Sequence, residues 1–199
     1  MAIKSGEKKT RAATREQILQ AARSELVEGG GDLELARVAK RAGVSDGLTY
    51  YHFGNKAGLI QALVQDFYAA MDSRVTAVPF AGTTWAERER SRVFAMVELF
   101  YLDPVALLVA TRLRTEPSLV AEEAERTTRM YELGARNVAQ AQRNGEINAA
   151  YNPLLLVSMI LAGVTEGVRV ALSTSPVIPL KDAQNEIWSF VARAAGVHA

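Results

Sequence analysis

The sequence predicts an all-α protein of about nine helices, with a small N-terminal bundle and a larger C-terminal helical domain. Sustained alternation of apolar and polar residues, which is typical of half-buried strands, is absent from the 199-residue chain. Helix start and stop signals recur along the chain instead. Hydrophobic residues make up 49% and charged residues 23%, as in ordinary globular proteins with a sizeable core.

The N-terminal bundle is expected to occupy residues 14–71. Thr14 and Gln17 have the spacing of a capping box, so the first helix is expected to begin at Thr14. Asp32 is the candidate cap of the second helix, and Ser45 is the candidate cap of the third. The helices of this bundle are expected at residues 14–28, 35–42, 45–52 and 55–71.

The C-terminal domain is expected to span residues 72–199, beginning with a linker at 72–84. Its helices are expected to begin at 84 and 104 and to span 118–144, 153–173 and 180–195. The longest uncharged stretch, 147–165, contains two asparagines and a proline. We expect a buried helix there rather than a membrane span, and a cytoplasmic protein with no membrane partner.

The residue types exclude several kinds of chemistry. The chain has no cysteine and only two histidines, His52 and His198, which excludes disulfides, thiolate catalysis and multi-histidine metal sites. No nucleotide-binding glycine motif follows a strand, and no nucleophile stands with a candidate base. We therefore expect neither a metal, a cofactor nor an enzyme, with carboxylate-only catalysis as the open alternative.

Positive charge concentrates at the N-terminus, although the formal net charge is only +1. Residues 1–60 carry ten Lys/Arg against seven Asp/Glu, and residues 1–15 carry five against one. We expect residues 1–13 to form a basic flexible arm. Such an arm either contacts a polyanion or serves as a solubilising tail.

The stretch from Leu35 to Phe53 has the spacing of a helix-turn-helix. Ala39 is small where two helices would cross, and Gly43 can adopt the positive φ that turns the chain sharply. A helix capped by Ser45 follows, as in helix-turn-helix motifs that read DNA. An ordinary corner between two helices is the alternative.

Four consecutive rings, at residues 50–53, make the third helix unusual. One helix cannot bury all four, so at least two rings are expected to be exposed, with Phe53 in the core. Exposed rings with polar tips suit phosphate hydrogen bonds and contacts to thymine methyl groups. Lys56, at the start of the next helix, is a candidate phosphate contact.

The segments AKRAGVS (39–45) and GLTYYHF (47–53), followed by Asn55 and Lys56, resemble the TetR family of bacterial transcriptional regulators. The resemblance covers residues 14–71 and implies a homodimeric, ligand-responsive repressor that binds a palindromic operator. By position, the residues that match family DNA contacts are Ser45, Gly47, Tyr50, Tyr51, His52 and Lys56.

Two positions in the third helix depart from the family pattern but are also candidate DNA contacts. The family commonly has Thr-Leu where this chain has Leu48-Thr49. Either the helix is slightly rotated, or Leu48 touches a thymine methyl group. Asp46 would repel phosphate unless it accepts a hydrogen bond from a cytosine amine.

Small residues recur every fourth position in the predicted helix at 153–173, which allows close approach of two helix backbones. The last helix has an apolar face as well. Two such helices from each subunit would form a four-helix bundle about a two-fold axis. The alternative is that these residues pack within one chain. The candidate dimer residues are Gly163, Gly167, Ala171, Ile187, Val191 and Ala194.

An effector pocket is expected among the helices of residues 84–173. Its candidate residues combine large apolar side chains with charges on apolar helices: Met96, Phe100, Arg112, Met130, Tyr131, Glu166 and Arg169. Glu166 and Arg169 could instead pair with each other. The sequence therefore predicts a DNA-binding regulator released by a small molecule. An architectural or effector-independent DNA-binding protein is the alternative.

Overall fold

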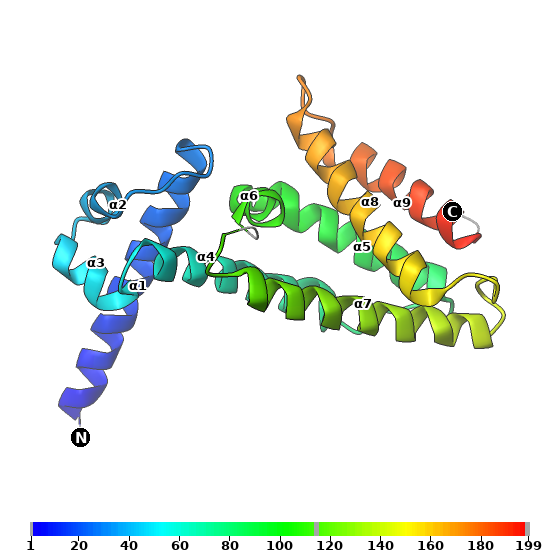
Figure 1. Cartoon of the computed structure of the whole chain (residues 1–199), viewed down its shortest axis with the longest axis horizontal. Helices are drawn as coiled ribbons and strands as arrows, with labels where there is room; N and C mark the ends of the chain where they lie inside the picture. Colours follow the sequence, from blue (N-terminus) through cyan, green and yellow to red (C-terminus); the bar gives the residue numbers. More distant parts are fainter. Residues whose placement is uncertain (1, 114–115, 198–199) are drawn as a thin grey trace. The chain divides into compact units, whose positions relative to one another are not determined.

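The computed structural model describes residues 2–113 and 116–197, and within these ranges it contains helices and no strand (Figure 1). The all-α prediction is confirmed. The helices, in chain order, are α1 (Ala2–Glu28), α2 (Leu35–Ala42), α3 (Asp46–Phe53), α4 (Lys56–Met71), the short π-helical turn η1 (Asp72–Thr76), α5 (Trp85–Leu102), α6 (Pro104–Thr111), α7 (Val120–Arg143), α8 (Pro153–Ser173) and α9 (Leu180–Ala195).

The contacts within the chain divide it into two units. The first contains α1, α2, α3, most of α4, and α6, and the second contains the end of α4, η1, α5, α7, α8 and α9. The sequence predicted one division after residue 71 and did not anticipate that α6 packs against α1 in the first unit. The functions assigned above to the ranges 14–71 and 72–199 remain predictions.

Helix α1 begins at Ala2, so two predictions about its start are wrong. The backbone of residues 2–13 is helical rather than a separate arm, and Thr14 lies inside the helix rather than at its cap. The capping-box pattern misled because the same Thr-x-x-Gln spacing can also occur inside a helix. Gln17 instead donates from Nε2 to the carbonyl oxygen of Ala42, at 2.7 Å, which ties α1 to the end of α2.

The turn between α2 and α3 forms as predicted. Gly43 has φ 66°, a left-handed conformation that glycine adopts without a steric penalty. Ser45 caps α3, since its Oγ accepts a hydrogen bond from the Leu48 amide at 3.3 Å. The prediction for α2 is wrong, because its cap position is Glu34, without a side-chain hydrogen bond. Asp32 lies instead 3.4 Å from a guanidinium nitrogen of Arg112.

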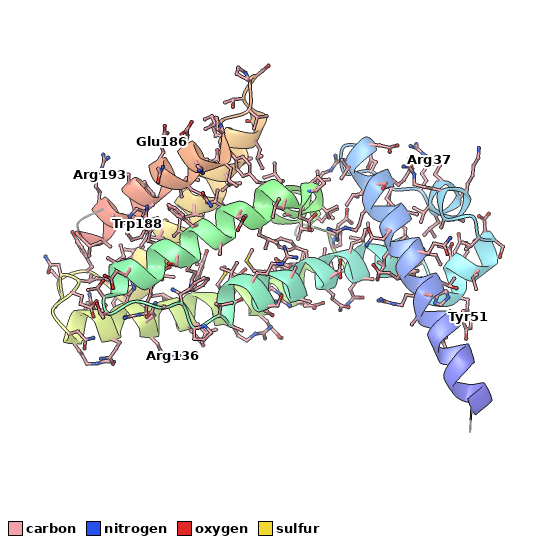
Figure 2. The ribbon with its side chains drawn as sticks, turned by 180° about the vertical axis from the view of Figure 1, so that it is seen from behind. Arg37, Tyr51, Arg136, Glu186, Trp188 and Arg193 are labelled. Carbon is pink, nitrogen blue, oxygen red and sulfur yellow. The ribbon has the colours of Figure 1, made fainter. Side chains whose placement is uncertain are left out.

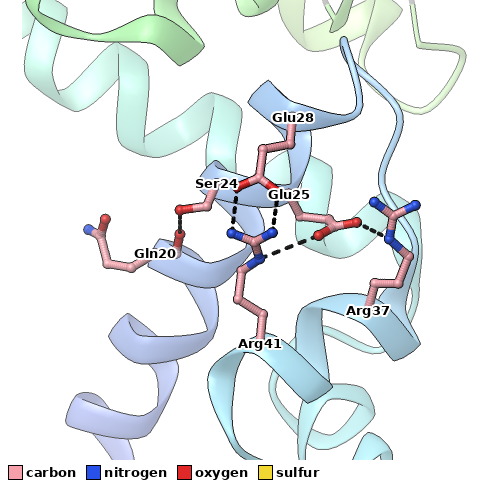
Figure 3. Close-up of polar contacts among 6 residues, drawn as sticks. All are labelled: Gln20, Ser24, Glu25, Glu28, Arg37 and Arg41. Atoms are coloured by element: carbon pink, nitrogen blue, oxygen red, sulfur yellow. Dashed lines mark hydrogen bonds and ion pairs between the residues drawn. The ribbon is translucent and has the colours of Figure 1, made fainter.

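A buried carboxylate joins α1 to α2 (Figure 3). The side chain of Glu25 is almost fully buried, and its two oxygens pair with Arg37 and Arg41 of α2. Arg41 also pairs with Glu28, one turn further along α1, and this contact lowers the pKa of Glu28. The charged ends of two α2 arginines are therefore held against one face of α1.

The second unit begins with a turn of helix where the sequence predicted a linker. Residues 72–76 form η1, and only the following segment up to Thr84 is irregular. Thr84 and Glu87 form the predicted capping box of α5. Asn152 caps α8 as expected, by accepting from the Leu155 amide at 3.0 Å, with Pro153 in the first turn.

Helix α8 is the centre of the second unit, where it packs against α5, α7 and α9. By length and composition alone, this 21-residue helix could cross a membrane, a possibility that the sequence analysis excluded for residues 147–165. One face of α8 is buried against its neighbours through Ile160, Val164 and Val168. Helices at the core of soluble proteins have the same composition.

We predict that Glu25→Gln lowers the free energy of unfolding by about 1–2 kcal/mol, because charge-assisted hydrogen bonds from two arginines are weakened. Urea titration followed by circular dichroism measures the change. The control is Glu125→Gln, which breaks an exposed pair with Arg129 and should cost less than about 0.5 kcal/mol. Equal losses in the two variants would contradict the structural role of Glu25.

Candidate nucleic-acid interface and ligand cavity

Helix α3 presents two tyrosines to solvent. The exposed fractions are 52% for Tyr50 and 62% for Tyr51, whereas Phe53 is buried, as the run of four rings predicted. Asp46 and Gly47, in the first turn, are exposed as well, together with the cap residue Ser45. The N-terminal half of α3 therefore displays short polar residues and its C-terminal half displays phenol rings.

The interior face of α3 explains the inverted Leu48-Thr49 pair. Thr49 is fully buried, and its hydroxyl oxygen makes no hydrogen bond with the described part of the chain. Leu48 is half-buried, so part of this apolar side chain remains accessible on the outer side. The helix thus buries the polar residue of the pair, which leaves Leu48 available for an apolar contact such as a thymine methyl group.

Two arginines of α1 stack on the rings of α3. The guanidinium carbon of Arg11 lies 4.9 Å from the centroid of the Tyr51 ring, and that of Arg15 lies 5.4 Å from the Phe53 ring. Cation–π contacts of this kind orient both partners. The basic end of α1 therefore lies beside α3, and Tyr51, labelled in Figure 2, carries a cation against its ring.

His52 is half-buried beside these cations, and its ring contacts Tyr51 at a centroid distance of 5.3 Å. Burial lowers the pKa of His52, and the positive charges of Arg11 and Arg15 lower this pKa further. The side chain is consequently neutral at pH 7 in the free protein. A neutral imidazole offers one donor and one acceptor.

Lys56 is exposed at the first position of α4, three residues after α3 ends. The side-chain oxygen of Asn55 accepts from the Gly58 amide at 2.9 Å, which fixes the start of this helix. A cation at a helix N-terminus is repelled by the positive end of the helix dipole. A bound phosphate would interact favourably with the lysine and with the dipole. Of the eight predicted DNA-contact residues, six are exposed and two, Leu48 and His52, are half-buried.

A cavity of about 270 Å³ lies inside the second unit, among η1, α5, α7, α8 and the last residue of α4. Most of its wall is apolar and includes three methionines, which adapt to ligands of different shape. These wall residues are Met71, Val75, Trp85, Val93, Met96, Met130, Leu133, Val138, Val157, Ile160, Leu161 and Val164. The polar residues of the wall are Thr76, Glu89, Arg92 and Asn137.

Only two of the seven predicted pocket residues, Met96 and Met130, line this cavity. Phe100 is buried in the core, and Tyr131 lies elsewhere on α7. Arg112 belongs to the first unit, where its guanidinium donates to the carbonyl oxygen of Gly30. The prediction failed for these residues because helical spacing alone does not show which side of a helix meets a cavity.

Glu166 and Arg169 pair with each other, one of the two alternatives that the sequence left open. Arg169 Nε donates to Glu166 at 2.8 Å, and both side chains are exposed outside the cavity. This hydrogen bond lowers the pKa of Glu166. The pair is therefore a surface contact along α8 rather than a polar group of the pocket.

The predicted dimer residues lie mainly between α8 and α9 of one chain. A Cβ atom at Gly163 would overlap the ring of Phe190, and one at Gly167 would lie 3.1 Å from Ile187 Cγ1. Ala171, Ile187 and Val191 are buried within the chain, and Ala194 is half-buried. The small residues therefore serve close packing inside one subunit, the alternative noted for them above.

Helices α8 and α9 leave a different set of apolar side chains in solvent. Leu155, Met159 and Val170 follow one face of α8 at helical spacing, with exposed fractions of 58%, 52% and 42%. Phe190 of α9 is 47% exposed. The outward side of α9 also carries Glu186 and Arg193, which are labelled in Figure 2. An apolar face of this kind is typical of a surface that meets a partner.

Glu89, Arg92 and Asn137 line the cavity but were not predicted from the sequence. Glu89 and Arg92 are three positions apart on α5, so the spacing of an ion pair was visible in the sequence. Their position on the cavity wall was not visible, because it depends on where α7 and α8 lie around the cavity.

Residues 18–63 match the sequence model of a family described as bacterial regulatory proteins of the tetR family. Over 60 residues the chain is 43% identical to the HTH-type transcriptional regulator TtgR of Pseudomonas putida, a match that covers 30% of this chain and 29% of that protein. It is 36% identical over 76 residues to the nucleoid occlusion factor SlmA of Vibrio campbellii, covering 37% and 38%. The similarity thus spans about a third of each relative's length.

Solved structures resemble the chain over most of its length. A putative TetR-family transcriptional regulator from Rhodococcus sp. matches with a TM-score of 0.70 at 24% identity, over 92% of this chain and 99% of that one. The regulator FadR from Bacillus subtilis, solved in complex with stearoyl-CoA, matches with a TM-score of 0.72 at 20% identity and the same coverage. At these identities the likeness shows a shared fold.

Proposed function

We propose that the chain, whose residues 18–63 match the tetR family of bacterial regulatory proteins, is a transcriptional repressor that binds a palindromic operator as a homodimer. The observation that carries the proposal is the exposed surface of α3, where Tyr50 and Tyr51 are both exposed and Tyr51 lies against the cation of Arg11. Phenol hydroxyls and guanidinium groups contact phosphates and base edges in major grooves.

A homodimer is part of this proposal, because two recognition helices one DNA turn apart read a palindrome. The exposed apolar residues of α8, together with Phe190, support a two-fold contact in which the same face meets itself. In this proposal the exposed apolar residues of α8 and Phe190 form the dimer contact, in place of the buried residues that were predicted from the sequence. A four-helix bundle made from α8 and α9 of both subunits would remove Leu155, Met159 and Val170 from water.

We infer further that a small molecule bound in the cavity controls DNA binding. FadR was solved with stearoyl-CoA, so one protein of this fold holds a ligand. In this chain Met71 lines the cavity at one end of α4, and Lys56 begins the same unbroken helix. A ligand that favours one position of α4 would thereby favour one state of the DNA-binding surface. Such a regulator acts in the cytoplasm.

An effector-independent DNA-binding protein is the second candidate. The 36% identity to a nucleoid occlusion factor, over 76 residues, is what favours it. The apolar cavity favours the first candidate, since an unliganded DNA-binding protein has no need of one.

Selection of DNA from a random pool tests the proposal. We expect the full chain to enrich a palindrome of about 15–20 base pairs, as two half-sites one helical turn apart require. Enrichment without any sequence preference would instead support an architectural role.

We predict that Tyr50→Ala weakens binding to the selected operator by at least about tenfold, because one good contact to a base edge contributes about 1–3 kcal/mol. Gel-shift titration measures the affinity. Tyr151→Ala is the matched control, since Tyr151 is a partly exposed tyrosine in the second unit. Unchanged affinity of Tyr50→Ala, with an intact helical spectrum, would remove Tyr50 from the interface.

We predict that Arg11→Gln lowers the salt dependence of operator binding. Loss of one phosphate contact reduces the slope of log K against log salt concentration by about 0.9. Fluorescence anisotropy at a series of salt concentrations gives this slope. Arg136→Gln, at an exposed arginine of α7, should leave it unchanged. A parallel loss of slope in both variants would point to overall charge rather than to a contact.

We predict that Met159→Asp converts the dimer to a monomer, because two-fold symmetry would bury two unpaired carboxylates at the contact. Sedimentation velocity measures the mass in solution. Leu102→Asp introduces the same charge at a residue that is 66% exposed on α5 and should leave the dimer intact. A Met159→Asp protein that remains dimeric would place the interface on another face.

A further inference from the structure

The charged groups on the cavity wall form a pair. Arg92 donates from its guanidinium to the carboxylate of Glu89, three residues earlier on α5. The side chains of Glu89 and Arg92 are 16% and 26% exposed, so both lie largely out of water. Arg92 also lies over the ring of Phe80, at 5.5 Å from the centroid. The two opposite charges thus compensate each other at the wall.

This pair opposes the binding of an ionic molecule. An anion would have to share Arg92 with Glu89, and a cation would have to share Glu89 with Arg92. In either case, a charge in an apolar cavity would be left incompletely paired, and a buried charge without its partner is strongly unfavourable. Burial already raises the pKa of Glu89, against the effect of Arg92, so the environment disfavours additional charge.

Two further polar residues line the cavity. The hydroxyl of Thr76 donates to a carboxylate oxygen of Asp72, at 2.7 Å, so its hydrogen is already used. Asn137, on α7, carries an amide that can both donate and accept. An amide of this kind binds a hydroxyl or a carbonyl group equally well. The rest of the wall is built mainly from aliphatic side chains and methionines, which suit a hydrocarbon body. Trp85 also lines the cavity, and its buried indole N–H makes no hydrogen bond with the described residues.

We propose that the cavity binds an uncharged, mainly apolar molecule with a single hydrogen-bonding group, and that Asn137 binds this group while the Glu89–Arg92 pair remains intact. This inference rests on the proposed ligand-dependent function and specifies the chemistry of its ligand. The volume of about 270 Å³ lies at the small end of the range for ligand sites, which suits a small molecule.

Three probes of equal chain length test the charge preference on the full-length protein: octanol, octanoate and octylammonium. Isothermal titration at pH 7 should show octanol binding at least about tenfold more tightly than either ion, a difference that corresponds to about 1.4 kcal/mol. Equal or tighter binding of octanoate or octylammonium would overturn the proposal. If none of the probes binds while operator binding persists, the inference fails and the DNA-binding function stands.

Variants of the cavity residues then test whether the Glu89–Arg92 pair causes the preference for an uncharged ligand. Glu89→Gln leaves Arg92 without a carboxylate, so octanoate affinity should rise at least about tenfold. Glu166→Gln is the matched control, because it breaks a pair with the same spacing outside the cavity. Asn137→Leu should weaken octanol binding by up to about tenfold through loss of one hydrogen bond. Should Glu89→Gln fail to fold, the three-probe comparison on the parent chain decides the question.

Discussion

The packing of α1 against the helix-turn-helix is the contact on which the DNA-binding surface depends. Helices α2 and α3 have eight residues each, and isolated helices of that length are marginal in water. Helix α2 persists because it packs against α1 and because the Glu25 carboxylate holds two of its arginines, and α3 in turn packs against α2. With α2 held in this way, the turn at Gly43 determines where α3 begins and which of its side chains remain in solvent.

The N-terminal part of α1 places two arginines against the rings of α3. Because α1 begins at Ala2, Arg11 lies on the helix and meets the ring of Tyr51 instead of belonging to a separate arm, and Arg15, one turn later, meets the ring of Phe53. The same two cations help to keep His52 neutral by lowering its pKa. Two of the five cations within residues 1–15 therefore lie against rings of α3.

Much of the first unit could be predicted from the sequence because its signals are local. A positive φ at Gly43, the cap at Ser45 and exposed rings at Tyr50 and Tyr51 follow from short-range geometry, and the structure agrees with each. The start of α1 could not be predicted in this way, since a capping pattern in the middle of a helix looks the same as one at its end. The buried threonine at position 49 likewise depends on packing behind α3.

The second unit shows what local patterns cannot decide. Glu89–Arg92 and Glu166–Arg169 have the same residue types and the same spacing on long helices. The first pair lines a cavity and lies largely out of water, whereas the second lies in solvent. What separates them is their surroundings: Glu89 and Arg92 line a cavity together with residues of α7 and α8, whereas Glu166 and Arg169 lie on the exposed side of α8. The proposed role of the Glu89–Arg92 pair in ligand selection therefore depends on tertiary packing, because only there does breaking the pair leave a charge without water.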